Sequence, residues 1–165
     1  MAALPAGQRA PDFTLPTVEG KKVSLHSALT KGPVVLVFFK INCPVCQYAL
    51  PFLERLHRAH HGEKVTVLGI SQNNRSDTLK FTREYGVSFP VALDDPANYA
   101  VSNAFGLTHV PTVFYVAPRG EIEISSVSWS KADIEAIHGK LAEQHKQDPA
   151  PLWRKGEEIA DFRAG

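Results

Sequence analysis

The sequence predicts an α/β fold with a central mixed sheet flanked by helices, and three observations lead to this prediction. Residues 33–40 form a continuous apolar, β-branched and aromatic run, which is typical of a strand buried on both faces. The motif Cys43-Pro-Val-Cys46 follows that run and opens a helical pattern. Further along, two strand-like segments, 112–116 and 121–128, precede an amphipathic helical pattern over 131–145. Alternation of this kind predicts a sheet covered by helices.

The remaining elements are predicted from local signals. A β-hairpin is expected within residues 8–29, where a turn-like segment separates apolar residues. The helix after the cysteines contains Pro51, which is expected to kink it, and Gly62 provides its stop. Ser76 is expected to cap the next helix, and Gly86 follows that helix. The other predicted elements are a strand over 65–71, a helix over 76–85, a short strand over 89–93 and a short helix over 97–105.

Length, composition and charge exclude several classes of protein. A chain of 165 residues suits one domain with a core large enough to be stable alone. The formal net charge of +1 gives no reason to expect nucleic acid or an anionic membrane surface as a partner. The first residues lack the basic start and long apolar run of a signal peptide. No stretch approaches the roughly 18 apolar residues needed to span a bilayer, so we expect a cytoplasmic protein in a reducing compartment.

The two cysteines of the chain lie three positions apart. A structural disulfide stabilises a protein mainly by closing a long loop in the unfolded chain, and this pair closes almost none. A structural zinc site usually needs four Cys or His ligands, and a second ligand pair is missing from the sequence. Redox chemistry is the interpretation that remains, and it implies no metal and no organic cofactor.

The position of Cys43 favours a reactive thiolate. Cys43 lies between the buried strand and the helix, and a helix N-terminus stabilises an anion. Because the thiolate is the reactive form of cysteine, we predict that Cys43 is the nucleophile. Cys46, one turn later, is placed to attack a mixed disulfide formed at Cys43. Pro44 stands in the first helical turn, where its missing N–H is tolerated.

Together these motifs resemble thioredoxin. The strand Val34–Phe39, the CxxC motif and Pro51, five residues after the second cysteine, match that family. The segment Val110-Pro111-Thr112 before a strand resembles the family's cis-proline loop. In the family this loop lies against the cysteines and binds the extended backbone of the substrate. The resemblance therefore implies a docking site shaped by Val110 and Pro111.

The N-terminal part resembles the redoxin branch, which joins peroxiredoxins and the thioredoxin-like reductases of cytochrome maturation. The resemblance implies a thioredoxin-like fold with an N-terminal hairpin and a redoxin-type insertion around residues 94–106. It divides the chain into a redoxin domain over 1–148 and a C-terminal tail over 149–165. Trp153 and Phe162 are expected to pack the tail against the domain. The matching residues are Gly7, 10–16, Gly20, 23–25 and 69–71.

The sequence also departs from the families that it resembles. Asn42 stands where a tryptophan usually precedes the first cysteine. The two positions at which relatives carry an acid that accepts the proton of the second thiol are Val37 and Ala49. Water, Lys40 or His109 remain as acceptors, and the sequence does not choose among them.

Two residues beside the motifs, His109 and Lys40, each have a functional interpretation and an alternative without a functional role. His109 lies two residues before Pro111, so in this fold it should face the cysteine pair and, when protonated, stabilise the Cys43 thiolate. The alternative is an exposed loop histidine. Lys40 flanks the cysteines together with Asn42, and either adds positive potential or simply ends the strand.

Other side chains suggest binding surfaces. His57, His60 and His61 follow i, i+3 and i+4 spacing on the first long helix. They either bind a metal or lie solvated at the helix C-terminus, where cations are favoured. Phe105 and Leu107, close to the predicted cis-proline loop, are candidates for an apolar partner groove.

The predicted activity is dithiol–disulfide exchange, with reduction of protein or small-molecule disulfides. Electrons would come from an external thiol donor of the thioredoxin reductase or glutathione type. A thiol-dependent peroxidase that uses the same cysteines is one alternative, and a binding module on a redox fold is another. In peroxiredoxins the peroxidatic cysteine aligns with Cys46, but the activating threonine and arginine align with Cys43 and Pro111, so both are replaced.

Overall fold

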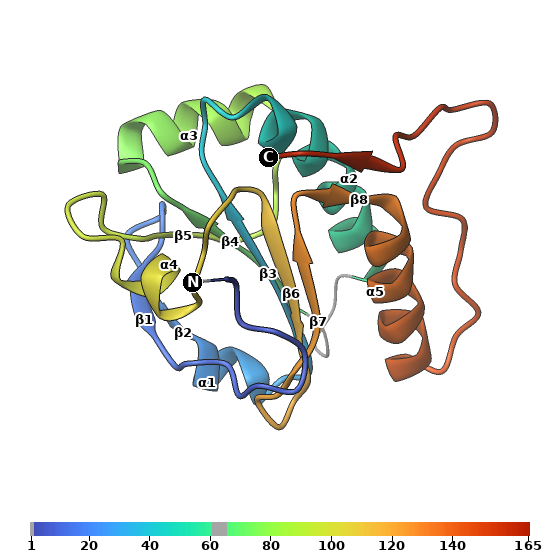
Figure 1. The fold of residues 1–165 in the computed structure, drawn as a ribbon, viewed down its shortest axis with the longest axis horizontal. Coiled ribbons are helices and arrows are strands. Elements are labelled where there is room, and N and C mark those ends of the chain that lie inside the picture. Colours follow the sequence, from blue (N-terminus) through green and yellow to red (C-terminus); the bar gives the residue numbers. More distant parts are fainter. Residues whose placement is uncertain (1, 61–65) are drawn as a thin grey trace.

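Five strands form the central sheet, in the order β5-β4-β3-β6-β7 (Figure 1). A computed structural model describes residues 2–60 and 66–165. Strand β3 is parallel to β4, which is parallel to β5, whereas β3–β6 and β6–β7 are antiparallel, so the predicted mixed sheet is confirmed. The strands are β3 (Val34–Phe39), β4 (Thr66–Ser71), β5 (Val91–Leu93), β6 (Thr112–Val116) and β7 (Ile122–Val127).

The central strand β3 is buried completely, as its sequence predicts. Every side chain from Val34 to Phe39 has no solvent-exposed surface. Because successive side chains of a strand point to opposite faces, β3 supplies both cores of the protein. Val35, Val37 and Phe39 belong to one core, and the three alternate residues belong to the other.

Helices cover both faces of the sheet (Figure 1). The first core packs side chains of α2 (Pro44–His60), α3 (Arg75–Glu84) and α5 (Lys131–Gln144) against the sheet. The second core holds α1 (Leu25–Leu29) and α4 (Ala100–Ala104). The predicted hairpin is confirmed, because β1 (Thr14–Pro16) pairs with β2 (Lys22–Ser24) in antiparallel register.

Helix α2 continues through Pro51 from Pro44 to His60. Its apolar stripe, Leu50, Leu53 and Leu56, is fully buried in the first core. The stop predicted at Gly62 and the predicted start of the next strand at residue 65 lie outside the described residues. No helix among residues 2–60 and 66–165 is long and apolar enough to cross a membrane.

Some predicted boundaries are wrong. Asn74 rather than Ser76 caps α3, because its side chain accepts a hydrogen bond from the N–H of Asp77 at 2.8 Å. Ser76 lies inside the first turn instead. Helix α4 is shorter than predicted, since a turn over residues 95–99 precedes it. Strand β7 ends at Val127, because Ser128 has a positive φ of 71° and turns the chain into β8 (Trp129–Ser130).

Residues 149–165 pack against the rest of the chain. Leu152 is buried in the first core, and Trp153 packs its ring against Phe52 and Trp129. The packing predicted for Trp153 is therefore confirmed. The packing predicted for Phe162 is wrong, because its side chain is 61% exposed. Only the backbone of Phe162 is held, since β9 (Phe162–Arg163) pairs with β8 in antiparallel register.

An ion pair also fastens the tail to α2. The two terminal guanidinium nitrogens of Arg55, Nη1 and Nη2, donate to the carboxylate of Glu157, at 2.6 and 2.7 Å. These charge-assisted hydrogen bonds lower the pKa of Glu157 to about 2. The tail is thus held by an apolar anchor, a bidentate ion pair and a strand pairing.

The two aromatic residues of the tail offer a matched test of this arrangement. We expect Trp153→Ala to lower the free energy of unfolding by about 2 kcal/mol, because it removes a partly buried ring from an aromatic cluster. Phe162→Ala should change it by no more than about 0.5 kcal/mol, because that ring faces solvent. Urea titration followed by circular dichroism measures both. Equal effects of the two variants would contradict the described packing of the tail.

Candidate active site

The thiol of Cys43 caps the N-terminus of α2. The carbonyl of Cys43 accepts the hydrogen bond of Gln47 N–H, so Cys43 stands at the N-cap position and Pro44 at the first helical position. The N–H of Cys46 donates to Cys43 Sγ at 3.2 Å. The sulfur thus takes the place of the oxygen that usually accepts this bond. Cys43 Sγ therefore lies where the helix N-terminus offers a backbone N–H to an acceptor.

The two cysteines lie in different environments. Cys43 is half-buried, whereas Cys46 has no exposed surface and belongs to the first core. Burial raises the pKa of the Cys46 thiol, and a hydrogen bond with Cys43 raises it further. Both cysteines are free thiols in the structure. Cys43 is therefore the accessible sulfur, and Cys46 is a protonated thiol beneath it.

The loop before β6 lies against Cys43. The Val110–Pro111 peptide bond is cis, as the resemblance to thioredoxin implies. The Cys43 Sγ lies 3.4 Å from the carbonyl oxygen of Val110. The loop is held from its other side, because Ser128 N–H donates to the carbonyl of Pro111 at 2.8 Å. The structure thus brings together the two cysteines, Val110 and Pro111, which are far apart in the sequence.

The other predicted site residues lie around this centre. Asn42 and Pro44 are exposed beside the cysteines. Lys40 is half-buried, with its Nζ 5.5 Å from the centre of the Tyr99 ring. Its positive charge acts weakly against the effects that raise the pKa of Cys46. His109 is exposed, and its Nδ1 hydrogen-bonds with Thr108 Oγ1 at 2.9 Å. The predicted role of His109 toward the Cys43 thiolate stays a prediction.

Sequence reasoning missed two residues that hold the segment before the cysteines. The side-chain oxygen of Asn73 accepts from Ile41 N–H at 3.0 Å, and Gln47 Nε2 donates to the carbonyl of Ile41 at 3.0 Å. Both bonds restrain the chain immediately before Cys43. No motif marks these residues, because their partner is a backbone group that becomes their neighbour only after folding.

The two positions expected to carry an acid are apolar and buried. Val37 lies in the first core and so does Ala49. Glu54 is a buried acid on the same helix, but its oxygens accept bonds from Ser88 and Arg58. Burial alone would raise the pKa of Glu54, and these hydrogen bonds lower it overall. Glu54 therefore serves as a charged anchor for the loop before β5.

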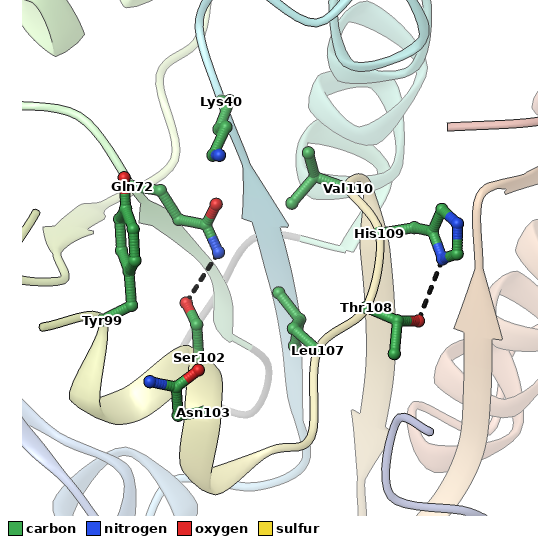
Figure 2. A pocket seen from close by; sticks show the side chains of 9 residues that line it. All are labelled: Lys40, Gln72, Tyr99, Ser102, Asn103, Leu107, Thr108, His109 and Val110. Carbon is green, nitrogen blue, oxygen red and sulfur yellow. Dashed lines mark hydrogen bonds between the residues drawn. The ribbon is translucent and has the colours of Figure 1, made fainter. Parts of the chain in front are cut away.

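A cavity of about 220 Å³ lies beside the cis-proline loop (Figure 2). Leu107 lines it, but Phe105 does not, because its ring is fully buried between Phe38 and Phe114. The groove predicted from Phe105 is therefore wrong. Polar side chains dominate the wall, and Gln72 Nε2 donates to Ser102 Oγ at 2.8 Å. Lys40, Tyr99, Asn103, Thr108, His109 and Val110 complete the lining.

The prediction of solvated histidines at the end of α2 is wrong at His60. His60 is 5% exposed rather than solvated, and its Nε2 lies 2.7 Å from His138 Nδ1. His57 packs against Phe89, with ring centres 6.0 Å apart, and His61 lies outside the described residues. No group of three or more potential ligands within residues 2–60 and 66–165 has the geometry to hold a metal ion.

The hydrogen bonds of His60 and His138 determine which ring nitrogen of each residue carries a proton. The carbonyl of Ala150 only accepts, so His138 Nε2 donates to it and His138 Nδ1 accepts from His60 Nε2. His60 Nδ1 is buried with no hydrogen-bond partner among the described residues. Burial, with further contributions from His138 and His145, lowers the pKa of His60 to about 4.

The fold and the cysteine pair define the class of the protein, a thioredoxin-like thiol–disulfide oxidoreductase. Comparison with family models then identifies the chain as a member of the AhpC/TSA family, whose model matches residues 6–125. The family assignment agrees with the redoxin resemblance of the N-terminal part.

Individual relatives agree with this class. The chain is 32% identical over 118 residues to the thiol–disulfide oxidoreductase ResA of Halalkalibacterium halodurans, covering 71% of this chain and 65% of the relative. It is 29% identical over 135 residues to ResA of Geobacillus thermodenitrificans, covering 81% of this chain and 76% of the relative. A solved structure described as a thiol:disulfide interchange protein of the DsbE type, from Chlorobium tepidum, superposes with a TM-score of 0.74 at 27% identity, covering 86% and 98% of the two chains.

The unequal burial of the two sulfurs predicts unequal alkylation. We expect iodoacetamide at pH 8 to modify Cys43 of the folded protein at least about tenfold faster than Cys46, because Cys43 is accessible whereas Cys46 is buried with a raised pKa. Peptide mass spectrometry measures the two rates. In 8 M urea the rates should become similar, which serves as the control. Rapid labelling of Cys46 in folded Cys43→Ser protein would contradict the assignment.

The buried His60 predicts acid destabilisation. Its folded pKa lies below the unfolded value, so the unfolded chain binds more protons between pH 6.5 and 4, and stability falls as the pH falls through that window. We expect a loss of about 2 kcal/mol between pH 6.5 and 5, where carboxylates contribute little. Urea titrations at several pH values measure it.

Two histidine variants provide the comparison for this experiment. His60→Phe should flatten the dependence of stability on pH, because it removes the titrating group from the core. His26 is exposed on α1, so His26→Gln should keep the wild-type slope. An unchanged slope in His60→Phe would rule out His60 as the origin.

Proposed function

We propose that this chain reduces disulfides by dithiol–disulfide exchange, and one observation carries the proposal. A half-buried Cys43, capped by the Cys46 N–H at 3.2 Å, lies directly above a buried Cys46 thiol. In this arrangement a substrate can reach the sulfur of Cys43, whereas the sulfur of Cys46 is buried and reacts only in a second step. It fits a two-step reaction in which the sulfurs have different roles.

The steps follow from these roles. The Cys43 thiolate attacks one sulfur of the substrate disulfide, forming a mixed disulfide and releasing the other substrate sulfur as a thiolate. The Cys46 thiol then loses its proton and attacks the Cys43 sulfur. A Cys43–Cys46 disulfide forms, and the second substrate sulfur leaves as a thiolate. The substrate gains two electrons, and the protein disulfide holds the oxidised state until an external dithiol reduces it.

Water is the acceptor that we propose for the Cys46 proton. The positions where relatives carry an acid hold Val37 and Ala49, and the Lys40 ammonium already carries its proton. His109 forms its hydrogen bond with Thr108 and lies on the exposed side of the loop. The leaving substrate thiolate is next to the mixed disulfide and takes up a proton from the same water.

The direction of the reaction is part of this proposal. Burial raises the pKa of the Cys46 thiol, so Cys46 stays protonated until the second step. The potential of the Cys43–Cys46 couple distinguishes a reductase from an oxidant.

Partners and location follow from this chemistry as further proposals. The substrate is a protein or small-molecule disulfide that can approach Cys43 beside Val110. The electron donor is an external thiol system of the thioredoxin reductase or glutathione type. We further propose a cytoplasmic location, because a reducing compartment would return the Cys43–Cys46 disulfide to the dithiol.

The peroxidase alternative has less support. The cysteine that aligns with a peroxidatic thiol is Cys46, which is buried and has a raised pKa. A peroxidatic cysteine must meet peroxide as a thiolate. Pro111 stands in place of the arginine that would polarise peroxide, and it is buried in the cis-proline loop.

Redox equilibration tests the proposal. We expect the Cys43–Cys46 couple to equilibrate with a dithiol buffer at a potential more negative than the glutathione poise of about −220 to −260 mV. The wild type should also reduce insulin disulfides. Cys43→Ser should abolish both reactions, whereas Cys46→Ser should accumulate a mixed disulfide, because its resolving thiol is missing. A couple more oxidising than glutathione would contradict the reductase, and oxidation by peroxide much faster than exchange would favour the peroxidase.

A further inference from the structure

The last six residues form an arm across the active-site end of the molecule (Figure 1). We call residues 160–165 the C-terminal arm. The N–H of Ala160 donates to the Tyr48 hydroxyl at 3.0 Å, and its carbonyl accepts from Trp129 Nε1 at 2.7 Å. The carbonyl of Asp161 then accepts from Lys131 N–H at 3.0 Å. From there β9 pairs with β8, so the arm lies extended along that strand.

The end of the arm contacts the loop that faces the nucleophile. Gly165 N–H donates to Ser128 Oγ at 3.0 Å. A Cβ added to Gly165 would clash with the carbonyl oxygen of Val110 and lie 3.2 Å from Pro111 Cδ. The same Val110 oxygen lies 3.4 Å from Cys43 Sγ. One carbonyl therefore has the arm and the catalytic sulfur as its neighbours.

The arm also covers the side of α2 that follows the cysteines. The guanidinium of Arg163 lies 4.1 Å from the centre of the Tyr48 ring, a cation–π contact. Tyr48 is two residues after Cys46. The arm thus occupies the surface bounded by Tyr48, strand β8 and the Val110 carbonyl, which we call the docking surface.

The contacts of the arm are those of a bound peptide rather than of a core element. The side chains of residues 161–165 are all exposed. The arm is held by backbone hydrogen bonds, one cation–π contact and a close approach that only glycine permits. Extended peptides bind proteins in this way, by adding a strand to an available edge. Release of the arm would therefore expose few buried side chains. Release of the segment around Leu152 and Trp153 would expose an apolar anchor instead.

We propose that, in the absence of substrate, the C-terminal arm occupies the docking surface and competes there with an extended segment of a protein disulfide substrate. This inference rests on the proposed exchange activity and names the partner and the regulation of the same site. The partner is an unfolded or extended protein segment that carries the disulfide. Its backbone replaces β9 along β8 while its disulfide reaches Cys43.

Competition of this kind has a defined thermodynamic consequence. The apparent affinity for the protein substrate equals the intrinsic affinity multiplied by the fraction of molecules whose arm is released. A small disulfide that reaches Cys43 without using β8 is not subject to this reduction. Release of the arm should therefore accelerate reduction of protein disulfides and leave reduction of small disulfides unchanged.

A substitution at the closest contact tests the proposal. Gly165→Val places a side chain where the Val110 carbonyl lies and should expel the end of the arm. We expect kcat/KM for insulin reduction to rise about three- to tenfold, with kcat/KM for oxidised glutathione within about twofold of wild type. Ala164→Val is the matched control, because Ala164 is the exposed neighbour, and it should resemble the wild type in both assays.

A second pair of variants uses the cation–π contact. Arg163→Ala should also raise kcat/KM for insulin, whereas Arg83→Ala, at an exposed position on α3, should not. A synthetic peptide of residues 161–165 should inhibit insulin reduction by Gly165→Val protein and spare its reaction with oxidised glutathione. Thermal melting of each variant shows that the fold is retained.

The outcomes separate this inference from the proposed function. If wild type and variants all fail to exchange with a dithiol buffer, the exchange activity itself is wrong. If exchange with that buffer is normal but Gly165→Val and Arg163→Ala reduce insulin no faster than wild type, only the role of the arm is overturned. The same conclusion follows if reduction of both substrates accelerates equally, because the arm would then block Cys43 rather than the docking surface.

Discussion

The hydrogen bond from the Cys46 N–H to Cys43 Sγ is the contact on which the chemistry of this protein depends. It exists because Cys43 holds the N-cap position of α2, which follows the fully buried strand β3. The burial of β3 between two cores fixes the place from which the chain leaves the sheet. Pro44 then begins the helix with a residue that needs no N–H partner. The sulfur thus takes a position where backbone geometry supplies a donor to an anion.

The same geometry separates the roles of the two cysteines. One helical turn carries the chain from the molecular surface at Cys43 into the first core at Cys46. The difference in burial follows from the helix and from the apolar stripe behind it rather than from any special property of the second sulfur. With Val37 and Ala49 as neighbours in the core, the environment of Cys46 is apolar, which accounts for its raised pKa.

The Val110 carbonyl lies between two surfaces of different character. On the side of β4 and α4 is the polar cavity that contains Lys40 and Gln72 (Figure 2). On the side of β7 and β8 is the docking surface covered by the C-terminal arm. A substrate that approaches Cys43 meets one of these surfaces. The first is open and polar, whereas the second is closed by the chain's own backbone, which gives the enzyme a means of distinguishing small disulfides from extended protein segments.

Local patterns in the sequence determined the elements of this protein and the identity of its reactive pair. The apolar run of β3, the spacing of Cys43 and Cys46 and the proline before β6 carry their signals within a few residues, because strand burial, helix capping and a cis X–Pro bond are local events. Other contacts depend on tertiary structure, and no local pattern in the sequence predicts them. The burial of His60 beside His138, the backbone restraint by Asn73 and the path of the C-terminal arm all join segments distant in sequence. Phe162 shows the reason, because an aromatic residue predicts burial, whereas the pairing of its backbone with β8 leaves its side chain in solvent.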